Sequence, residues 1–270
     1  MQKEGEIIAN ILLFMQRIRY NFVIITPGRC GSEHLSETLN YFGDITMDGE
    51  IFNRNNYSSD SFNHHLRKDT IRSLIGFFFN REKLSRYWMN IPLHFAIQRF
   101  LSNDSFSKSS IVGFKLSLDQ LHAYPYILYI LSKKKCRIIY LYREDKLSQV
   151  LSLIKARNTG EYHYREERNA RKTYNFNVKQ VGKQYQQLIQ WESSLMHQLA
   201  NEDSYTLSYE SLFSAYPTHI NAIRSFLNLS ESESFQYSSL IKGNSARLEE
   251  WVSNIEEIKK ELASTYGIQN

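Results

Sequence analysis

An arginine flanked by glycines follows the first predicted strand of the chain. The segment reads TPGRCGSEH over residues 26–34, and a predicted helix begins at Ser32, a residue type that favours helix N-termini. The free N–H groups and the dipole of such a helix attract an anion, and Arg29 adds a fixed charge with forked donors. Gly28 and Gly31 permit backbone conformations that other residues resist. The loop therefore predicts a phosphate or sulfate site, with an ordinary strand–helix turn and a surface arginine as the alternative.

The same loop disfavours ordinary ATP or GTP hydrolysis. A Walker A loop needs Gly-x-x-x-x-Gly-Lys-Ser/Thr, and this run is absent from the sequence. A nucleotide or sugar kinase would need that lysine and a magnesium-binding acid, so it stands as an alternative function. No spacing of Cys and His typical of a metal site is visible either.

A second predicted anion site follows another strand. Arg143 directly follows the apolar run 138–142. Ser152 lies nine residues farther on, a distance of about two and a half helical turns. A nucleotide lying along that helix would place Arg143 and Ser152 on one phosphate, since arginine–phosphate pairs are charge-assisted and often bidentate. The alternative is a surface arginine with Ser152 facing solvent.

Predicted strands and helices alternate along the chain. Short apolar runs predict strands at 22–25, 111–116, 138–142 and 205–209, and helical spacing predicts helices after residue 32 and at 146–157, 178–199, 216–227 and 247–266. This order implies an α/β fold, a P-loop-like central parallel β-sheet flanked by helices on both faces. Ligands of such sheets bind beyond the carboxyl ends of the strands, where the loops after Ile25 and Tyr142 lie.

The composition fits one domain spanning residues 1–270. Hydrophobic residues make up 42% and charged residues 23%, and neither a repeat nor a low-complexity linker divides the chain. The net charge of +5 suits an anionic ligand, but there is no dense Lys/Arg stripe that would predict nucleic-acid binding. The basic run at 165–172 is interrupted by two glutamates and fits a solvated helix face.

The cysteines and the N-terminal stretch bear on location. Cys30 and Cys136 are the two cysteines of the chain, too few for a disulfide scaffold, and they predict a reducing, cytoplasmic compartment. The apolar stretch 7–15 is too short to span a bilayer, which takes roughly 20 residues, and it lacks the basic flank and cleavage site of a signal peptide. Its spacing predicts a packing helix, with peripheral membrane or dimer contact as alternatives.

Taken together, these segments resemble the sulfotransferases that use 3′-phosphoadenosine 5′-phosphosulfate (PAPS) as donor. The run RCGS at 29–32 is similar to their 5′-phosphosulfate loop, where Arg-x-Gly-Ser/Thr follows the first strand. GEIFN at 49–53 resembles the Gly-Glu segment of nodulation-factor and trehalose sulfotransferases, and REDKL at 143–147 with Ser152 resembles their 3′-phosphate segment. Three further segments also resemble the family: VGFKL at 112–116, YESL at 209–212 and the tail from Lys242 to Glu257. All of these segments occur in the same order as in the family.

The resemblance implies a donor site and an acceptor class. The residues implied in PAPS binding are Arg29, Cys30, Gly31, Ser32, Glu33, His34, Arg143, Ser152, Tyr209 and Lys242. Tyr209 would meet the adenine and Lys242 would close over the 3′-phosphate, although a core tyrosine and a solvated lysine explain them too. Arg29 would stabilise charge developing on the sulfuryl and leaving phosphate oxygens, so no metal is expected. The expected acceptor is a hydroxyl of a carbohydrate or glycolipid, a class that comes from the resemblance alone.

Glu50 is the candidate general base. Sulfuryl transfer needs a proton removed from a weakly acidic hydroxyl as its oxygen attacks sulfur, and a carboxylate in a partly dry cleft suits that task. The resemblance places such a glutamate beside the acceptor. His34 is the rival base because it adjoins the sulfuryl loop, and a surface glutamate in a turn is the plain alternative. The other sulfotransferase pattern, Lys followed two residues later by His, is not met because Ser117 follows Lys115, which favours Glu50.

Two residues depart from the family pattern. Cys30 stands where a small serine is common, which predicts a spacer, with a redox role as the alternative. Glu33 brings a negative charge to the predicted phosphate site. Directed outward it would favour the helix N-terminus, whereas directed inward it would repel the sulfate. A non-catalytic nucleotide-binding or scaffold protein is therefore a third function, and Glu33 is its main support.

Residues 54–110 match no segment of the resemblance. Their place after Glu50 predicts an acceptor-site or lid insertion within the single domain, with an inserted helical packing unit as the alternative. TGEYHY at 159–164 would also suit an acceptor site, since aromatic faces stack on sugars. The family often has Trp where Tyr162 stands, so trehalose itself is not implied, and the oligomeric state is not predicted.

Overall fold

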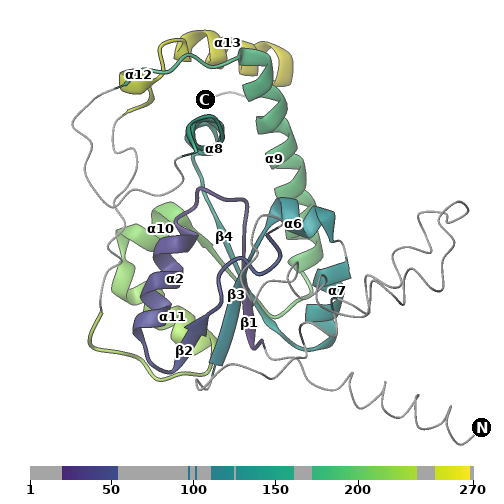
Figure 1. Cartoon of the computed structure of the whole chain (residues 1–270), viewed down its shortest axis with the longest axis vertical. Coiled ribbons are helices and arrows are strands. Elements are labelled where there is room, and N and C mark those ends of the chain that lie inside the picture. The colour runs from purple at the N-terminus through teal and green to yellow at the C-terminus, as the bar shows by residue number, and fades with distance from the viewer. Residues whose placement is uncertain are drawn as a thin grey trace, which may run out of the picture.

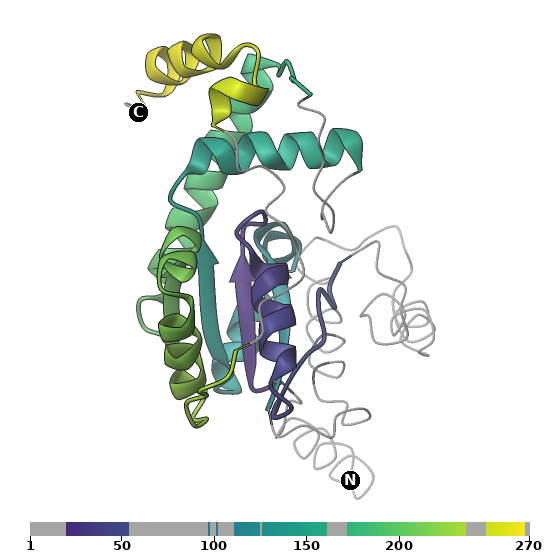
Figure 2. The same cartoon turned by 90° about the vertical axis from the view of Figure 1, so that its left-hand side faces the viewer.

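The structure is a computed structural model that describes residues 20–53, 97, 101, 111–124, 126–160, 172–235 and 247–267. The expected helix at 7–15, most of the basic run 165–172, Lys242 and all of the expected insertion 54–110 except Ile97 and Leu101 lie outside the described residues. Within the described chain, one sheet lies between helices, as Figure 1 and Figure 2 show.

Five parallel strands form this sheet in the order β2-β3-β1-β4-β5. Their bounds are Phe22–Thr26 for β1, Ile45–Met47 for β2, Ile111–Ser117 for β3, Arg137–Tyr142 for β4 and Ser204–Ser208 for β5. In the centre, Ile24 of β1 lies opposite Lys115 of β3 and Ile139 of β4. The expected central parallel sheet is confirmed, and its strands all end at the same edge.

Helices cover both faces of the sheet, as expected. One face carries α2 (Ser32–Tyr41), α10 (Tyr209–Ser214) and α11 (Tyr216–Phe226), and the other carries α6 (Leu118–Ala123), α7 (Tyr126–Lys133) and the end of α9 (Val178–Leu199). Residues of β1 alternate between the two cores: Phe22 and Ile24 pack with the first set, and Val23 and Ile25 with the second. Because both faces are covered, β1 is an unbroken apolar run.

A further helical layer crosses the carboxyl edge of the sheet. The helix after β4, α8 (Lys146–Thr159), packs with α9, α12 (Leu248–Trp251) and α13 (Ile255–Tyr266) around a core of their own. Figure 2 shows α8 lying across the ends of the strands. Among the helices of the described residues, none is both long and apolar enough to cross a membrane.

Two element boundaries differ from the expected ones for local reasons. The strand expected at 205–209 ends at Ser208, because Ser208 caps α10 by accepting from the backbone N–H of Ser211. The helix expected at 247–266 is interrupted after Trp251, where Asn254 hydrogen-bonds the backbone of Phe176 through both ends of its amide. The short elements β2, α6, α7 and α10 were not expected, because three to eight residues show too little periodicity.

The two described residues of the expected insertion belong to the core. Ile97 and Leu101 have no exposed side-chain surface and pack in the cluster beneath α6 and α7. At these two positions the segment contributes to the core, and the acceptor-site or lid role of residues 54–110 stays a prediction.

Candidate functional site

The loop between β1 and α2 adopts a left-handed conformation at three positions. The φ angle is 85° at Gly28, 57° at Arg29 and 75° at Gly31, a region that non-glycine residues rarely adopt. Gly31 is the N-cap of α2, and a Cβ there would lie 3.0 Å from Cδ2 of Tyr209. Glycine at position 31 is therefore required by backbone conformation and by the adjacent ring. The loop leads into the first turn of α2, whose N–H groups lack intrahelical acceptors.

Gln149 of α8 holds this loop. Its buried Nε2 donates to the Gly28 carbonyl at 2.7 Å and to Cys30 Sγ at 3.1 Å. Burial raises the pKa of the Cys30 thiol to about 12, so the thiol stays protonated near neutral pH and is a poor nucleophile. This favours the spacer role of Cys30 over the redox alternative. Gln149 was not predicted, although its place three residues before Ser152 puts both on one helical face.

Arg29 and Ser152 meet across the carboxyl edge. Arg29 Nε donates to Ser152 Oγ at 3.0 Å, which links the loop after β1 to the helix after β4. The sequence predicted that Ser152 and Arg143 share one phosphate, and that pairing stays a prediction. The structure adds a contact of Ser152 with Arg29, because the face of α8 that carries Gln149 and Ser152 is turned toward the loop. The two predicted anion-binding segments are therefore neighbours.

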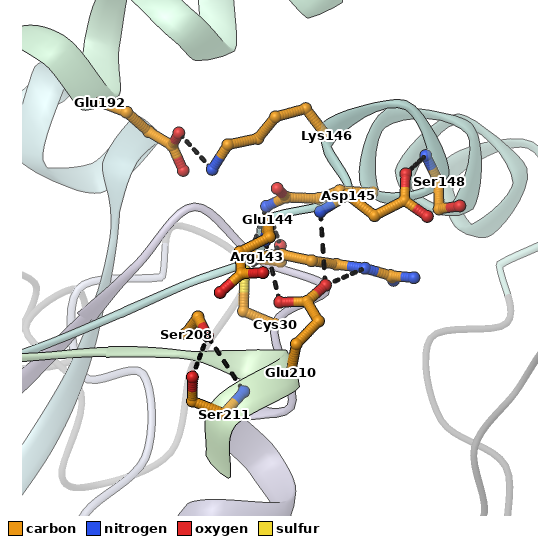
Figure 3. A network of polar contacts seen from close by, with 12 residues as sticks. Cys30, Arg143, Glu144, Asp145, Lys146, Ser148, Glu192, Ser208, Glu210 and Ser211 are labelled. Carbon is orange, nitrogen blue, oxygen red and sulfur yellow. Dashed lines mark hydrogen bonds and ion pairs between the residues drawn. The ribbon is translucent and has the colours of Figure 1, made fainter. Parts of the chain in front are cut away.

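Arg143 lies against the first residues of α10. Its Nε is 3.7 Å from Glu210 Oε1, and its guanidinium lies 5.2 Å from the centroid of the Tyr209 ring. The Glu210 carboxylate also accepts the backbone N–H groups of Glu144 at 2.9 Å and Asp145 at 3.3 Å. Glu210, which was not predicted, thus fixes the backbone beside Arg143 and contacts the base of the guanidinium, whose end extends beyond it (Figure 3).

A buried ion pair joins α8 to α9 next to Arg143. Lys146 Nζ lies 2.5 Å from Glu192 Oε2, and the two side chains are 14% and 10% exposed (Figure 3). Burial, together with the charge of Glu192, raises the pKa of the neighbouring Tyr140. Removing one partner of such a pair leaves a buried charge uncompensated. The pair therefore fixes the junction of β4 and α8 from which Arg143 projects.

Glu33 is paired with a lysine from the neighbouring strand. Lys115 Nζ of β3 donates to Glu33 Oε2 in a short charge-assisted contact, and the lysine is buried while the glutamate is partly exposed. Because the pair is close to neutral, the repulsion that an isolated Glu33 would exert on a bound anion is reduced. The acid at the loop is thus compensated from β3, a contact that local sequence does not indicate.

Glu50 lies on a turn attached to β3. The backbone N–H of Lys115 donates to the Gly49 carbonyl at 2.7 Å, and Gly49 has a left-handed φ of 69°. The Glu50 carboxylate accepts from Gln120 Nε2 at 3.2 Å. Since β2, β3 and β1 are neighbours in the sheet, Glu50 and the Arg29 loop lie at the same edge.

His34 faces a different part of the molecule from Glu50. Its ring packs on Phe213 and Tyr216, with centroid separations of 4.9 and 5.3 Å. Burial lowers the pKa of His34, and its Nε2 is buried without a hydrogen-bond partner in the described residues. His34 is thus a neutral imidazole against α10 and α11, whereas Glu50 is bonded to α6 on the other face of the sheet.

The edge therefore gathers four cationic side chains, Arg29, Lys115, Arg143 and Lys146, which come from or follow β1, β3 and β4. Within the described ranges, no group of three or more His, Cys, Asp or Glu side chains is placed to hold a metal ion. Chemically, this edge offers arginine and backbone donors for two anionic groups, and one carboxylate, Glu50, on the β2 side.

Comparisons with known proteins give likenesses of fold at low identity. A scan against protein-family models and a search of curated proteins found no match. Among solved structures, a sulfotransferase from Alicyclobacillus acidocaldarius is similar, with a TM-score of 0.47 and 13% identity over 93% of this chain and 92% of that chain. Mouse sulfotransferase SULT7A1 complexed with PAP has a TM-score of 0.40 and 13% identity, over 79% of this chain and 60% of that chain. At these values, neither likeness assigns a residue or an activity to this chain.

From the Glu33–Lys115 pair we expect that a second substitution restores the ligand binding that a first one weakens. Lys115→Met should weaken binding of adenosine 3′,5′-bisphosphate by roughly tenfold, about 1.4 kcal/mol, because Glu33 is left uncompensated beside the anion loop. Glu33→Gln combined with Lys115→Met should restore most of that affinity. Isothermal titration calorimetry on the wild type, Lys115→Met and the double variant measures both effects. Equal affinities for Lys115→Met and the double variant would contradict this explanation.

Proposed function

We propose that the protein is a sulfotransferase that moves a sulfuryl group from PAPS to a hydroxyl of a carbohydrate or glycolipid. The observation that carries the proposal is the 3.0 Å hydrogen bond from Arg29 Nε to Ser152 Oγ. It joins the loop at the N-terminus of α2 to the helix that follows Arg143. This supports the proposal that one nucleotide can reach both segments. A donor with phosphate groups at both its 5′ and 3′ positions needs such a pair of segments.

In this proposal the donor lies across the ends of β1 and β4. Its 5′-phosphosulfate is held by Arg29 and the backbone N–H groups of Gly31 to His34, and its 3′-phosphate by Arg143 and Ser152. The support for Arg143 is that Glu210 contacts it at Nε, which directs the terminal nitrogens past the carboxylate toward a ligand. Tyr209 would contact the adenine from beneath Arg143, and Lys242 would close over the 3′-phosphate.

The proposed reaction is a direct displacement at sulfur. The acceptor oxygen forms a bond to sulfur while the bond from sulfur to the bridging oxygen breaks, and that electron pair leaves on the 5′-phosphate of adenosine 3′,5′-bisphosphate. Glu50 takes the acceptor proton as general base. Arg29 and the N–H groups of α2 stabilise the charge that develops on the sulfuryl and leaving oxygens. No step in this scheme requires a metal ion.

The proposal also names an acceptor class and a cellular compartment. The carbohydrate or glycolipid acceptor rests on the resemblance of GEIFN at 49–53, with 54–110 and 159–164 as candidate acceptor segments. The cytoplasm is proposed because Cys30 and Cys136 are free, buried thiols, which suits a reducing compartment.

Ligand titration tests the proposed donor. Adenosine 3′,5′-bisphosphate should bind in the absence of magnesium, and Mg-ATP should not compete with it. A preference for Mg-ATP would instead indicate a kinase, and binding of neither would indicate a scaffold. The acceptor is then sought by following transfer of label from [³⁵S]PAPS to trehalose, chitin oligosaccharides, a glucosylated lipid and p-nitrophenol.

Arg143→Ala should weaken adenosine 3′,5′-bisphosphate much more than adenosine 5′-phosphate. Loss of a charge-assisted phosphate contact should cost ~1.5–3 kcal/mol, and the second ligand lacks the 3′-phosphate. Arg137→Ala is the matched control, because Arg137 begins β4 at the opposite edge and pairs with Asp203 at 3.4 Å. An equal loss for both ligands would remove Arg143 from the 3′-phosphate site.

Glu50→Gln should leave nucleotide affinity nearly unchanged and lower turnover by ~10²–10⁴-fold, the usual worth of general acid–base catalysis. The substitution keeps the shape of the side chain but removes its capacity to take a proton. His34→Asn is the control, because His34 packs against α10 and α11. Retained turnover in Glu50→Gln together with its loss in His34→Asn would transfer the base role to His34.

A further inference from the structure

Gln120 is a buried polar residue in direct contact with the Glu50 carboxylate. Its side chain is 6% exposed, and its Nε2 donates to Glu50 Oε2 at 3.2 Å. The two residues are 70 positions apart and come from different elements, the turn after β2 and the helix α6. Burial of an amide is costly unless its donor and acceptor are both satisfied, so this contact constrains where Gln120 and Glu50 can lie.

The orientation of the Gln120 amide is fixed by its other end. Gln120 Oε1 accepts the backbone N–H of Ser117 at 3.2 Å, as the third helical residue of a capping box at the start of α6. Because the oxygen is committed to Ser117, the NH₂ group must point at the carboxylate. The capping box of α6 therefore orients the Gln120 NH₂ group, a neutral hydrogen-bond donor, toward Glu50.

The chain around Glu50 leaves it little freedom to move away from this donor. Ile51 is 1% exposed and Phe52 is fully buried, and Phe52 packs on Phe114 of β3 with ring centroids 5.9 Å apart. Asn53 Nδ2 donates to the same oxygen, Oε2, at 3.0 Å. Two amides on one carboxylate oxygen, together with an anchored backbone, restrain the position of Glu50 Oε2 and so the direction of the side chain.

We propose that Gln120 is a positioning residue for Glu50, which it holds in the orientation that receives the acceptor proton. This inference rests on the proposed function. An amide suits the role because it restrains a carboxylate without placing a positive charge beside it, whereas a lysine or arginine at this place would stabilise the charged carboxylate more strongly. In this proposal Gln120 acts only through Glu50.

Gln120→Glu is the sharpest variant. It keeps the Oε1 acceptor for the Ser117 N–H, and Glu is itself favoured at this capping-box position, but it replaces the donor facing Glu50 with a second carboxylate. With [³⁵S]PAPS and the acceptor identified in the panel, kcat should fall by about 10–100-fold through misplacement of the base. The Kd of adenosine 3′,5′-bisphosphate should stay unchanged. Wild-type kcat in Gln120→Glu would overturn the inference.

Two controls separate positioning from folding. Ser117→Ala removes the other side chain of the capping box and should retain turnover. In a Glu50→Gln background, Gln120→Glu should cause no further loss, because the group that it positions is already inactive. Additive losses in the double variant would mean that Gln120 acts independently of Glu50, and the inference would be wrong.

If the wild type transfers no label to any acceptor, that result counts against the sulfotransferase proposal. The hydrogen bond between Gln120 and Glu50 can then still be tested on the protein alone. The ¹H–¹⁵N side-chain resonances of Gln120, identified by their loss in Gln120→Glu, should shift in Glu50→Ala and stay in place in His34→Asn. Unchanged Gln120 resonances in Glu50→Ala would overturn the positioning contact itself.

Discussion

The parallel pairing of β1 between β3 and β4 is the constraint on which the site depends. Thr26 lies opposite Ser117, and Ile25 lies opposite Tyr140, so the loops that follow all three strands leave the sheet at one edge. A shift of β1 by one residue would move its loop by about 3.3 Å and turn its side chains to the wrong faces. The contact of Arg29 with Ser152 and that of Glu33 with Lys115 would both be lost.

Two buried glutamines hydrogen-bond the segments that follow neighbouring strands. Gln149, on the helix after β4, binds the loop after β1, and Gln120, on the helix after β3, binds the turn after β2. Each amide thus reaches from one strand's helix to the segment that follows the adjacent strand. A neutral amide holds such a segment without changing the charge that the segment presents.

The cations of the edge differ in how firmly their carboxylate partners are held. The Glu192 side chain, paired with Lys146, is 10% exposed, whereas Glu210 beside Arg143 and Glu33 beside Lys115 are 34% and 36% exposed. A buried partner cannot be rehydrated cheaply, so the Lys146 pair is structural. The carboxylates of Glu210 and Glu33 are more accessible to water, so their pairs with Arg143 and Lys115 are more strongly screened than the Lys146 pair.

The amino-acid sequence by itself determined the fold class and two of the charged residues of the edge, Arg29 and Arg143. The run at 22–25, the periodicity at 178–199 and the alternation of strands with helices were sufficient, because hydrophobic spacing is local and reports directly which face is buried. Arg29 and Arg143 were recognisable because a cation shortly after a buried parallel strand must emerge at the carboxyl edge of the sheet. The roles assigned to them, to Glu50 and to Lys242 remain predictions.

Only the tertiary structure decided which polar residues meet. Gln149, Gln120 and Glu210 are ordinary residue types in their own helices, and nothing in their neighbours distinguishes them from solvated side chains. Their partners lie 121, 70 and 66 residues away, and the pairing of Lys115 with Glu33 likewise spans 82 residues. Contacts of this kind follow from the order and register of the strands, which set the positions of segments distant in the sequence and which no local pattern of residues specifies.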